Sequence, residues 1–389
     1  MQRRLTLGVA LVGALATLTV AGCSSNGSSG TISGAQSSTN ASPASGGAKA
    51  AQAFLQKYTG TPTSINLTVP LKSAPAKGKT VIFIGNTTTD GLRVVAGVRA
   101  AVEALGWKVT VLDADPTNPS TGNSAILQAV QARPDFIGYL TDPASSVASG
   151  LAAAKSAGIP VFPVAVAEAP SEADWRFSDP FGAADFALGG KVNAAYVVSQ
   201  SASDAKVLVV AVPSIANQKV WQESFNGEMA ATCPKCVVHD LDVQFSDVLS
   251  GAVPAQVVSF LRSNPDYKQV VFSVGAFTAG FAAAAQAGGL TLGTGQNDIK
   301  VTSYSASPNN LSDLEAGTEQ MSIATAEPWA GWLTVDAMAR YDEHMSLQPN
   351  WNTSMPIWLE EKAGVTNVNT LWTGPTGYQD QFEKLWHVG

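Results

Sequence analysis

The residues best suited to metal or redox chemistry are three cysteines and three histidines, and their spacing excludes most of that chemistry. Cys233 and Cys236 form a Cys-Pro-Lys-Cys pair, but a zinc ribbon would need a second such pair, which the sequence lacks. His239, His344 and His387 are scattered along the chain, without the spacing of metal ligands or of a Ser/His/Asp triad. The sequence therefore predicts no metal, no cofactor and no catalytic residue.

A structural disulfide is the main interpretation of Cys233 and Cys236. The chain begins with an export signal, described below, and disulfides persist in oxidising compartments. The bond would close a short loop between a predicted helix and the next predicted strand. The alternative is a redox enzyme that uses this pair. A redox pair normally opens a helix after a strand, whereas this one follows a helix and precedes a strand.

The charge balance and the glycine pattern argue against nucleic-acid and nucleotide binding. Lys and Arg total 23 against 30 Asp and Glu, and no basic stripe follows the first few residues. No phosphate-binding glycine loop follows the first predicted strand. With 45% apolar residues the chain has enough hydrophobic side chains for a globular fold. We therefore expect a compact protein without nucleic acid as a partner.

Residues 1–22 have the pattern of a bacterial export signal. Two arginines precede an uncharged apolar stretch, Leu5–Val20, which is short for a membrane span. Val20–Cys23 (Val-Ala-Gly-Cys) resembles a lipobox, in which the signal is cut before the cysteine and the thiol carries a diacylglycerol. We expect lipidation of Cys23, which would hold the protein at the outer face of the cell membrane. An ordinary secretory signal with an incidental cysteine is the alternative.

Residues 23–48 are predicted to be a disordered tether. They are almost entirely Ser, Gly, Ala, Thr and Asn, and such a tract cannot bury enough apolar area to offset its chain entropy. The segment Lys49–Tyr58 is predicted to be a short helix that starts the ordered part of the protein.

The rest of the chain alternates short apolar, β-branched runs with stretches of helical periodicity. The alternation of strand and helix patterns begins again about halfway along the chain. We therefore predict an α/β protein with two Rossmann-like lobes whose parallel sheets are covered by helices. The predicted strands are residues 80–85, 107–112, 134–140, 159–166, 205–212, 237–243, 269–274 and 300–305. The predicted helices are residues 91–105, 124–132, 145–157, 186–199, 219–231, 253–263 and 276–287.

Five short phrases of the sequence carry a family resemblance through their order and spacing. They are Val81-Ile82-Phe83-Ile84, Gly106-Trp107-Lys108-Val109, Arg133-Pro134-Asp135-Phe136-Ile137, Ala157-Gly158-Ile159-Pro160-Val161 and Leu188-Gly189-Gly190-Lys191. Together they resemble solute-binding proteins of the type I periplasmic-binding fold, in the branch of ribose- and galactose-binding proteins. The resemblance runs from about Lys79 to Tyr341. It implies a monomer with a three-crossing hinge and a ligand in the cleft between the lobes.

The resemblance also implies lobe boundaries. The three crossings would lie near Ser178–Asp179, Tyr304–Ser305 and Met345–Pro349. The N-terminal lobe would then consist of residues 49–179 plus 306–346, and the C-terminal lobe of residues 180–305 plus 347–389.

Candidate ligand-binding residues follow from the rule that open parallel sheets bind ligands beyond the carboxyl ends of their strands. Turns after predicted strands, the hinge and one late turn supply them. They are Asn86, Thr87, Asp90, Asp142, Asp179, Phe181, Trp221, Phe277, Tyr304, Glu327 and Trp329. For several of these a structural role is the alternative: Asp90 or its neighbour Thr89 could cap a helix, Asp142 could do the same, and each aromatic side chain could pack in the core.

The sequence departs from the sugar-binding relatives at three strand ends. Those relatives usually have Asp-Arg, Asn-Asp and Asp where this chain has Ala165-Val166, Gly275-Ala276 and Ser305. Sugar hydroxyls are usually held by charge-assisted hydrogen bonds, which these residues cannot supply. The predicted aromatic faces suit sugars, purines or other rings alike. The ligand class therefore stays open.

These observations predict a lipid-anchored, extracytoplasmic solute-binding protein of an ABC importer. It would close by hinge motion around a small sugar or sugar-like ligand and deliver it to the permease subunits. The alternative is a sensory binding protein that presents a less polar ligand, such as a nucleoside or ring compound, to a membrane receptor. The expected partners are the ligand, the permease and, through Cys23, the membrane.

Overall fold

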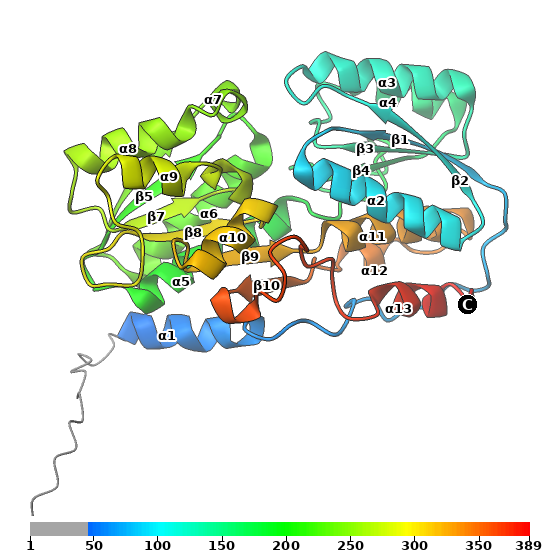
Figure 1. The fold of residues 1–389 in the computed structure, drawn as a ribbon. Coiled ribbons are helices and arrows are strands. Elements are labelled where there is room, and N and C mark those ends of the chain that lie inside the picture. Colours follow the sequence, from blue (N-terminus) through cyan, green and yellow to red (C-terminus); the bar gives the residue numbers. More distant parts are fainter. Residues whose placement is uncertain (1–45) are drawn as a thin grey trace, which may run out of the picture. The chain divides into compact units, whose positions relative to one another are not determined.

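The computed structural model describes residues 46–389, which form two open sheets and their covering helices (Figure 1). The predicted signal, the lipidation site Cys23 and nearly all of the predicted tether lie outside these residues. Among residues 46–389 no helix is both long and apolar enough to cross a membrane.

The first sheet is parallel, with strand order β2-β1-β3-β4. Its strands are β1 (Thr80–Gly85), β2 (Lys108–Asp113), β3 (Phe136–Leu140) and β4 (Val161–Val164). Its helices are α2 (Thr89–Ala104), α3 (Pro119–Ala132), α4 (Ala148–Ala157) and α11 (Glu327–Asp342). Helices α3 and α4 share one hydrophobic cluster on one face of the sheet, and α2 and α11 share another on the opposite face. The edge strand β2 is half-exposed, whereas β3 and β4 are buried throughout.

The second sheet has the order β10-β9-β8-β7-β5-β6, and only β10 runs antiparallel to its neighbour. Its strands are β5 (Lys206–Ala211), β6 (Val237–Asp242), β7 (Gln269–Phe272), β8 (Lys300–Tyr304), β9 (Met321–Thr325) and β10 (Ile357–Glu360). Its helices are α5 (Ala183–Gln200), α6 (Ala216–Thr232), α7 (Phe245–Ser250), α8 (Val253–Ser263), α9 (Phe281–Ala287) and α10 (Pro308–Ala316), with a 3₁₀ turn at Gly275–Thr278. The predicted class, α/β with two mainly parallel sheets, is confirmed.

The end of the second sheet differs from the predicted boundaries. Residues 306–325 were assigned to the first lobe, with a crossing at Tyr304–Ser305. Instead β9 pairs in parallel with β8, and the chain leaves the second sheet only at Ala326, where α11 begins. All five residues of β9 are buried, so this short strand completes the sheet rather than connecting the lobes.

The N-terminal segment also differs, because it starts against the second sheet. The predicted short helix is present as α1 (Gly46–Leu55) followed by a 3₁₀ turn at Gln56–Tyr58. Helix α1 packs against α5 (Figure 1), although residues from 49 onward had been assigned to the first lobe. The chain then runs beside α13 (Tyr378–Leu385) on its way to β1, and Leu71 N donates to Leu385 O at 2.9 Å.

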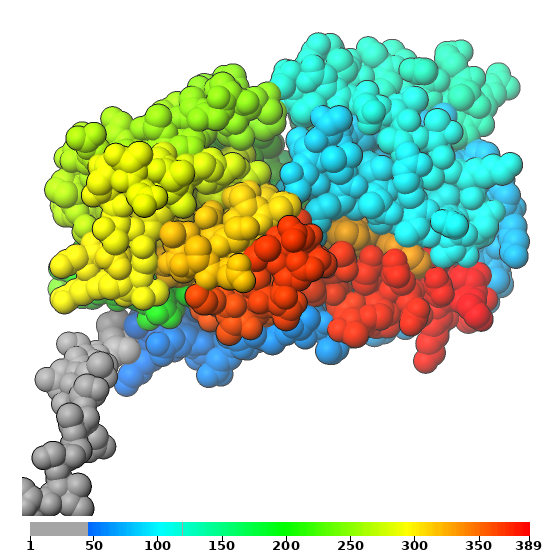
Figure 2. All heavy atoms as spheres, viewed as in Figure 1, coloured from blue at the N-terminus to red at the C-terminus, as the bar shows by residue number. Residues whose placement is uncertain are grey.

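The C-terminal segment runs along one side of the described part of the molecule, coloured orange to red in Figure 2. It contains α12 (Gln348–Trp351), strand β10, a 3₁₀ turn at Lys362–Gly364 and α13. While β10 extends the second sheet, α13 packs on α11, where Trp332 stacks on Trp386 with 5.1 Å between ring centroids. The tail therefore contacts elements of both sheets.

Helix α11 holds a fully buried ion pair. Arg340 Nε donates to Asp336 Oδ2 at 2.6 Å, and both side chains are 0% exposed. Trp386 Nε1 donates to Asp336 Oδ1 at 2.9 Å, and Asn350 Nδ2 donates to Asp336 Oδ2 at 3.1 Å. Arg340 Nη2 also donates to Val69 O at 2.5 Å. Because a buried charge is costly unless it is paired and hydrogen-bonded, this network fixes the segments around α11.

Helices α2 and α11 approach so closely that two glycines are required at the contact. A Cβ atom on Gly331 would lie 2.5 Å from Val98 N and 2.6 Å from Val94 O. Gly97 faces the start of α11 in the same way, and a Cβ atom added there would overlap the backbone of Pro328. The obstacles are backbone atoms of a regular helix, so they cannot move aside as a flexible side chain could.

Replacing Gly331 with Ala should therefore destabilise the protein. We expect the free energy of unfolding to fall by about 1–3 kcal/mol, the usual cost of overpacking a core. Chemical denaturation would measure it. The matched control is Gly227→Ala in α6, where no atom lies within 4 Å of the added methyl. This control should be neutral or stabilising by up to about 1 kcal/mol, and equal effects of the two substitutions would contradict the packing argument.

Candidate ligand-binding site

Three residues that directly follow strands have backbone conformations unusual for their type. Thr141 follows β3, Ala165 follows β4 and Ser305 follows β8, with φ values of 63°, 57° and 57°. Non-glycine residues in this left-handed region cost roughly 1–3 kcal/mol each and gather at functional sites. All three lie at the carboxyl ends of parallel strands, where open α/β sheets bind ligands. We therefore take these strand ends as the candidate site.

The turn after β1 is organised by a helix cap that the sequence interpretation misplaced. Thr88, rather than Thr89 or Asp90, caps α2, because Thr88 Oγ1 accepts from Gly91 N at 3.1 Å. Asn86 Oδ1 in turn accepts from Thr88 N at 3.1 Å and from Thr88 Oγ1 at 2.7 Å. Asn86 is thus buried and already used by the turn, while Thr87 is exposed.

A cluster of charged and hydroxyl side chains connects α2 to the second sheet. Arg93 forms an ion pair with Glu327 and donates to Thr325 O at 3.3 Å. Ser305 Oγ lies 3.0 Å from Asp90 Oδ2 and 3.1 Å from Glu327 Oε1. Thr325 Oγ1 also donates to Glu327 Oε1. We call these five residues the junction cluster; it brings together Asp90 and Glu327, which the sequence predicted, and Arg93, which it missed.

The junction cluster holds two carboxyl groups around one guanidinium. The pKa of Asp90 is raised from 3.8 to about 7, mainly by burial and also by the charge of Glu327, against the opposing effects of Arg93 and of the hydrogen bond with Ser305. A single hydroxyl proton on Ser305 cannot serve both acids. If Asp90 is protonated, it donates to Ser305, and Ser305 donates to Glu327, so the hydrogen-bond chain is complete. The other carboxyl oxygen, Asp90 Oδ1, is buried and has no hydrogen-bond partner among residues 46–389.

The start of α6 reaches the first crossing between the sheets. Asn217 Nδ2 donates to Ala165 O at 2.6 Å, and Asn217 Oδ1 is buried without a partner. The next residue, Gln218, accepts through Oε1 from Val212 N at 3.1 Å and from Ser273 Oγ at 2.9 Å, which ties the ends of β5 and β7 together. The sequence predicted Trp221 of this helix as a ligand contact and did not single out Asn217.

Two further predicted carboxylates lie at the strand ends of the first sheet. Asp142, after β3, is half-buried, and burial raises its pKa from 3.8 to about 6. Asp179 lies on the first crossing and accepts from Val166 N at 3.2 Å. Burial raises its pKa well above 3.8, against the opposing effect of that hydrogen bond. Neither residue belongs to the junction cluster.

The predicted aromatic ligand contacts are packed in the core. The exposed fractions of Phe181, Trp221, Phe277, Tyr304 and Trp329 are 3%, 0%, 5%, 0% and 0%. In this conformation their rings therefore offer no surface to a ligand, and the alternative interpretation, core packing, describes them.

Ring contacts explain this burial. Phe181 stacks on Phe186 at 4.8 Å, and Phe186 meets Tyr304 edge to face at 5.4 Å, measured between ring centroids. Trp221 stacks on Phe225 at 5.4 Å. Phe181, Tyr304, Trp221 and Trp329 all belong to a single hydrophobic cluster that includes residues of both sheets. The contacts of Phe181, Phe186 and Tyr304 thus hold the first crossing against α5 and β8 of the second sheet.

The structure also shows the arrangement of the two cysteines and of the side chains that could bind a metal. Cys233 and Cys236 form a disulfide at the end of α6, as the structural interpretation predicted. Within residues 46–389, no three His, Cys, Asp or Glu side chains gather as metal ligands would.

The sheets, their crossings and the strand-end polar groups define a two-lobed binding protein. Residues 81–343 match the family described as the periplasmic binding protein domain, and the chain belongs to this family. The predicted resemblance to type I periplasmic binding proteins is thereby confirmed. No curated protein sequence matches the chain.

Solved structures of sugar-related binding proteins share the fold. A periplasmic ribose ABC transporter protein from Conexibacter woesei is 19% identical, with a TM-score of 0.64 over 76% of this chain and 95% of that chain. A solute-binding protein from Agrobacterium vitis, bound with α-D-tagatopyranose, is 22% identical, with a TM-score of 0.63 over 75% and 97%. Another, from Burkholderia graminis in complex with D-arabinose, is 16% identical, with a TM-score of 0.62 over 76% and 99%.

Replacing Asp90 with Asn should weaken the dependence of stability on pH. Because folding raises this pKa from 3.8 to about 7, the folded protein keeps a proton that the unfolded chain has released in this window. The free energy of unfolding should therefore fall as pH rises from about 4 to about 7, by at most about 1.4 kcal/mol per pH unit for this group, and level off above. Chemical denaturation across this range would measure the slope.

Other buried carboxyl groups also lower the free energy of unfolding as pH rises, and they are still present in Asp90→Asn. Burial raises the pKa of Glu319 to about 8 and that of Glu360 to about 7, so the wild-type slope contains their contributions too. The difference between the two slopes is the readout. The exposed substitution Glu223→Gln should leave the slope unchanged. Identical slopes for wild type and Asp90→Asn would show that Asp90 does not titrate in this way.

Proposed function

We propose that this protein is the solute-binding component of an ABC importer and holds a small sugar or sugar-like ligand between its two lobes. Its membership of the periplasmic binding protein family supports a binding role. The observation that carries the ligand assignment is the junction cluster, which joins α2 to the ends of β8 and β9 and leaves Asp90 Oδ1 without a partner.

The chemistry of the strand ends favours a polyhydroxylated ligand over a flat ring compound. Asp90, Asp142, Asp179 and Glu327 lie there, and carboxyl oxygens accept hydrogen bonds from sugar hydroxyls. Asn217 Oδ1 is a further buried acceptor without a partner. The aromatic faces that would have suited a nucleoside are buried in the core. Glu327, Asp90 Oδ1 and Asn217 Oδ1 are buried in this conformation as well, so a ligand would reach these polar groups only when the lobes open. Of the candidates proposed from sequence, Thr87 is exposed and Asn86 is occupied by the turn.

Closure of the lobes would follow from contacts of one ligand with both sheets. A ligand stabilises the closed state only through contacts that the open state lacks. Asp90 belongs to α2 of the first lobe, and Ser305 belongs to the second. Hydroxyls of one ligand that contact both would therefore couple binding to closure. The permease would then recognise the surfaces of the closed lobes.

A binding screen tests the ligand class. Calorimetry against pentoses, hexoses, polyols, nucleosides and aromatic acids should give saturable binding for at least one sugar, and small-angle scattering should show a smaller radius of gyration with it. Asp90→Ala should weaken that binding at least about tenfold, the loss expected for one hydrogen bond to a charged group.

The matched control for the binding screen is Glu223→Gln, an exposed acid on α6 that should leave the affinity within about twofold, a free-energy change below 1 kcal/mol. If every sugar fails while a nucleoside or aromatic acid binds, the sugar assignment is wrong. If no ligand reduces the radius of gyration, hinge closure is wrong as well.

We also propose that the protein is anchored at the outer face of the cell membrane by lipid on Cys23. The lipobox-like Val20–Cys23 and the Ser- and Gly-rich stretch after it support this. Two or more acyl chains are needed for stable anchoring, and a diacylglycerol supplies two.

Replacing Cys23 with Ser should release the protein from the membrane. In cell fractionation the wild type should sediment with membranes and carry a lipid mass on its N-terminal peptide, whereas Cys23→Ser should be soluble and unlipidated. Ser24→Ala is the control and should behave as the wild type. Membrane association that survives in Cys23→Ser would contradict the lipid anchor.

A further inference from the structure

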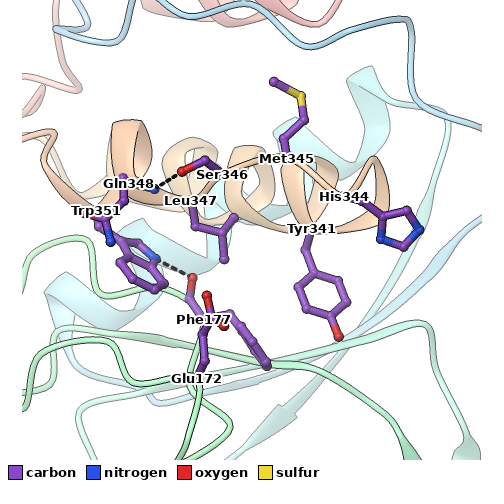
Figure 3. A pocket seen from close by; sticks show the side chains of 9 residues that line it. All are labelled: Glu172, Phe177, Tyr341, His344, Met345, Ser346, Leu347, Gln348 and Trp351. Carbon is purple, nitrogen blue, oxygen red and sulfur yellow. Dashed lines mark hydrogen bonds between the residues drawn. The ribbon is translucent and has the colours of Figure 1, made fainter.

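A cavity lies away from the strand ends, where the first and third crossings between the sheets meet. Its volume is about 300 Å³. One wall comes from the loop before α5 and the other from the chain between α11 and α12 (Figure 3). The residues that line it are Glu172, Phe177, Tyr341, His344, Met345, Ser346, Leu347, Gln348 and Trp351. Pockets of this kind occur preferentially between domains, and this volume is at the small end for a ligand site.

The aromatic walls of the cavity are held in place. Phe177 and Tyr341 meet edge to face with 4.8 Å between ring centroids. Trp351 Nε1 donates to Phe177 O at 2.8 Å, which fixes the indole against the opposite wall. In Figure 3 the rings of Trp351 and Tyr341 lie on either side of Leu347. Such rings need no rearrangement to receive a ligand, so little ordering cost opposes binding.

The charge in the cavity is negative. Glu172 is exposed, and its carboxylate forms no ion pair or hydrogen bond with the residues that the structure describes. Glu172 and Tyr341 both line the cavity, and burial together with the charge of Glu172 raises the pKa of Tyr341. Of the residues that line the cavity, His344 is the one basic side chain, and none is Lys or Arg. Lys155, which donates to Ala173 O beside this wall, makes no ion pair with Glu172.

We propose that this cavity binds a small organic ammonium ion with an apolar body. A cation over the face of Trp or Tyr is attracted by the ring quadrupole, and fixed aromatic rings recognise alkylated ammonium groups in this way. Glu172 supplies the opposite charge, and Leu347 and Met345 supply apolar contacts. The site is independent of the proposed cleft ligand.

Choline is the probe, and 3,3-dimethylbutan-1-ol is its neutral counterpart of the same shape. Calorimetry on the full mature protein should show saturable choline binding. The neutral alcohol should bind at least about tenfold more weakly, since it lacks the cation–π and ionic attraction. Glu172→Gln should weaken choline binding by about the same factor, and this exposed substitution should not disturb folding.

Matched variants separate the cavity from general charge effects and from the cleft. Asp174→Asn removes an equally negative side chain two residues away that does not line the cavity, and it should leave the affinity within about twofold. Tyr341→Phe keeps the ring and should retain binding, whereas Tyr341→Leu should lose it. The proposal is overturned if choline does not saturate, if the neutral alcohol binds equally well, or if Glu172→Gln binds as the wild type does. It is also overturned if Asp90→Asn abolishes choline binding and Glu172→Gln does not.

Discussion

The buried ion pair of Asp336 and Arg340 is the constraint on which the architecture around the hinge depends. Both side chains belong to α11 and are 0% exposed, and further hydrogen bonds join them to Asn350 of α12, to Trp386 and to the backbone of Val69. An isolated charge at this depth would be very costly, so all of these segments must be in place together. One helix, α11, therefore fixes the segment before β1 that contains Val69, the third crossing and the C-terminal tail. This helix itself packs on α2 through glycines.

The continuity of the hydrophobic core across the crossings has a direct consequence for the site. Phe181, Phe186 and Tyr304 pack on one another where the first crossing meets α5 and β8, so they are structural in this conformation. The polar groups at the strand ends are carboxyl, hydroxyl and amide groups. Those of the junction cluster are linked to one another by hydrogen bonds and an ion pair. Two acids lie beside one guanidinium there, and burial, together with the charge of Glu327, raises the pKa of Asp90. A ligand that donates hydrogen bonds is the natural complement to such a surface.

Much of the fold could be predicted from the sequence. The prediction of β1 as 80–85 and of α8 as 253–263 agrees with the structure residue for residue, because a buried parallel strand is a continuous apolar run and a surface helix shows clear periodicity. The predictions were weaker where local pattern is ambiguous. Strand β9 was missed, and residues 276–287 were predicted as one helix, although Gly280, with φ of 79°, separates a 3₁₀ turn from α9.

By itself, the sequence determined the α/β class, the family, and the polar character of several strand ends, because these follow from short-range patterns of apolar and polar residues. Only the tertiary structure decided which of those residues meet. Arg93 lies three residues after Asp90 on α2, yet its partner Glu327 is more than two hundred residues further along the chain. Burial of the hinge aromatics likewise depends on rings from separate segments. Long-range contacts of this kind leave no local pattern, so a side chain next to a strand end can line the site or fill the core.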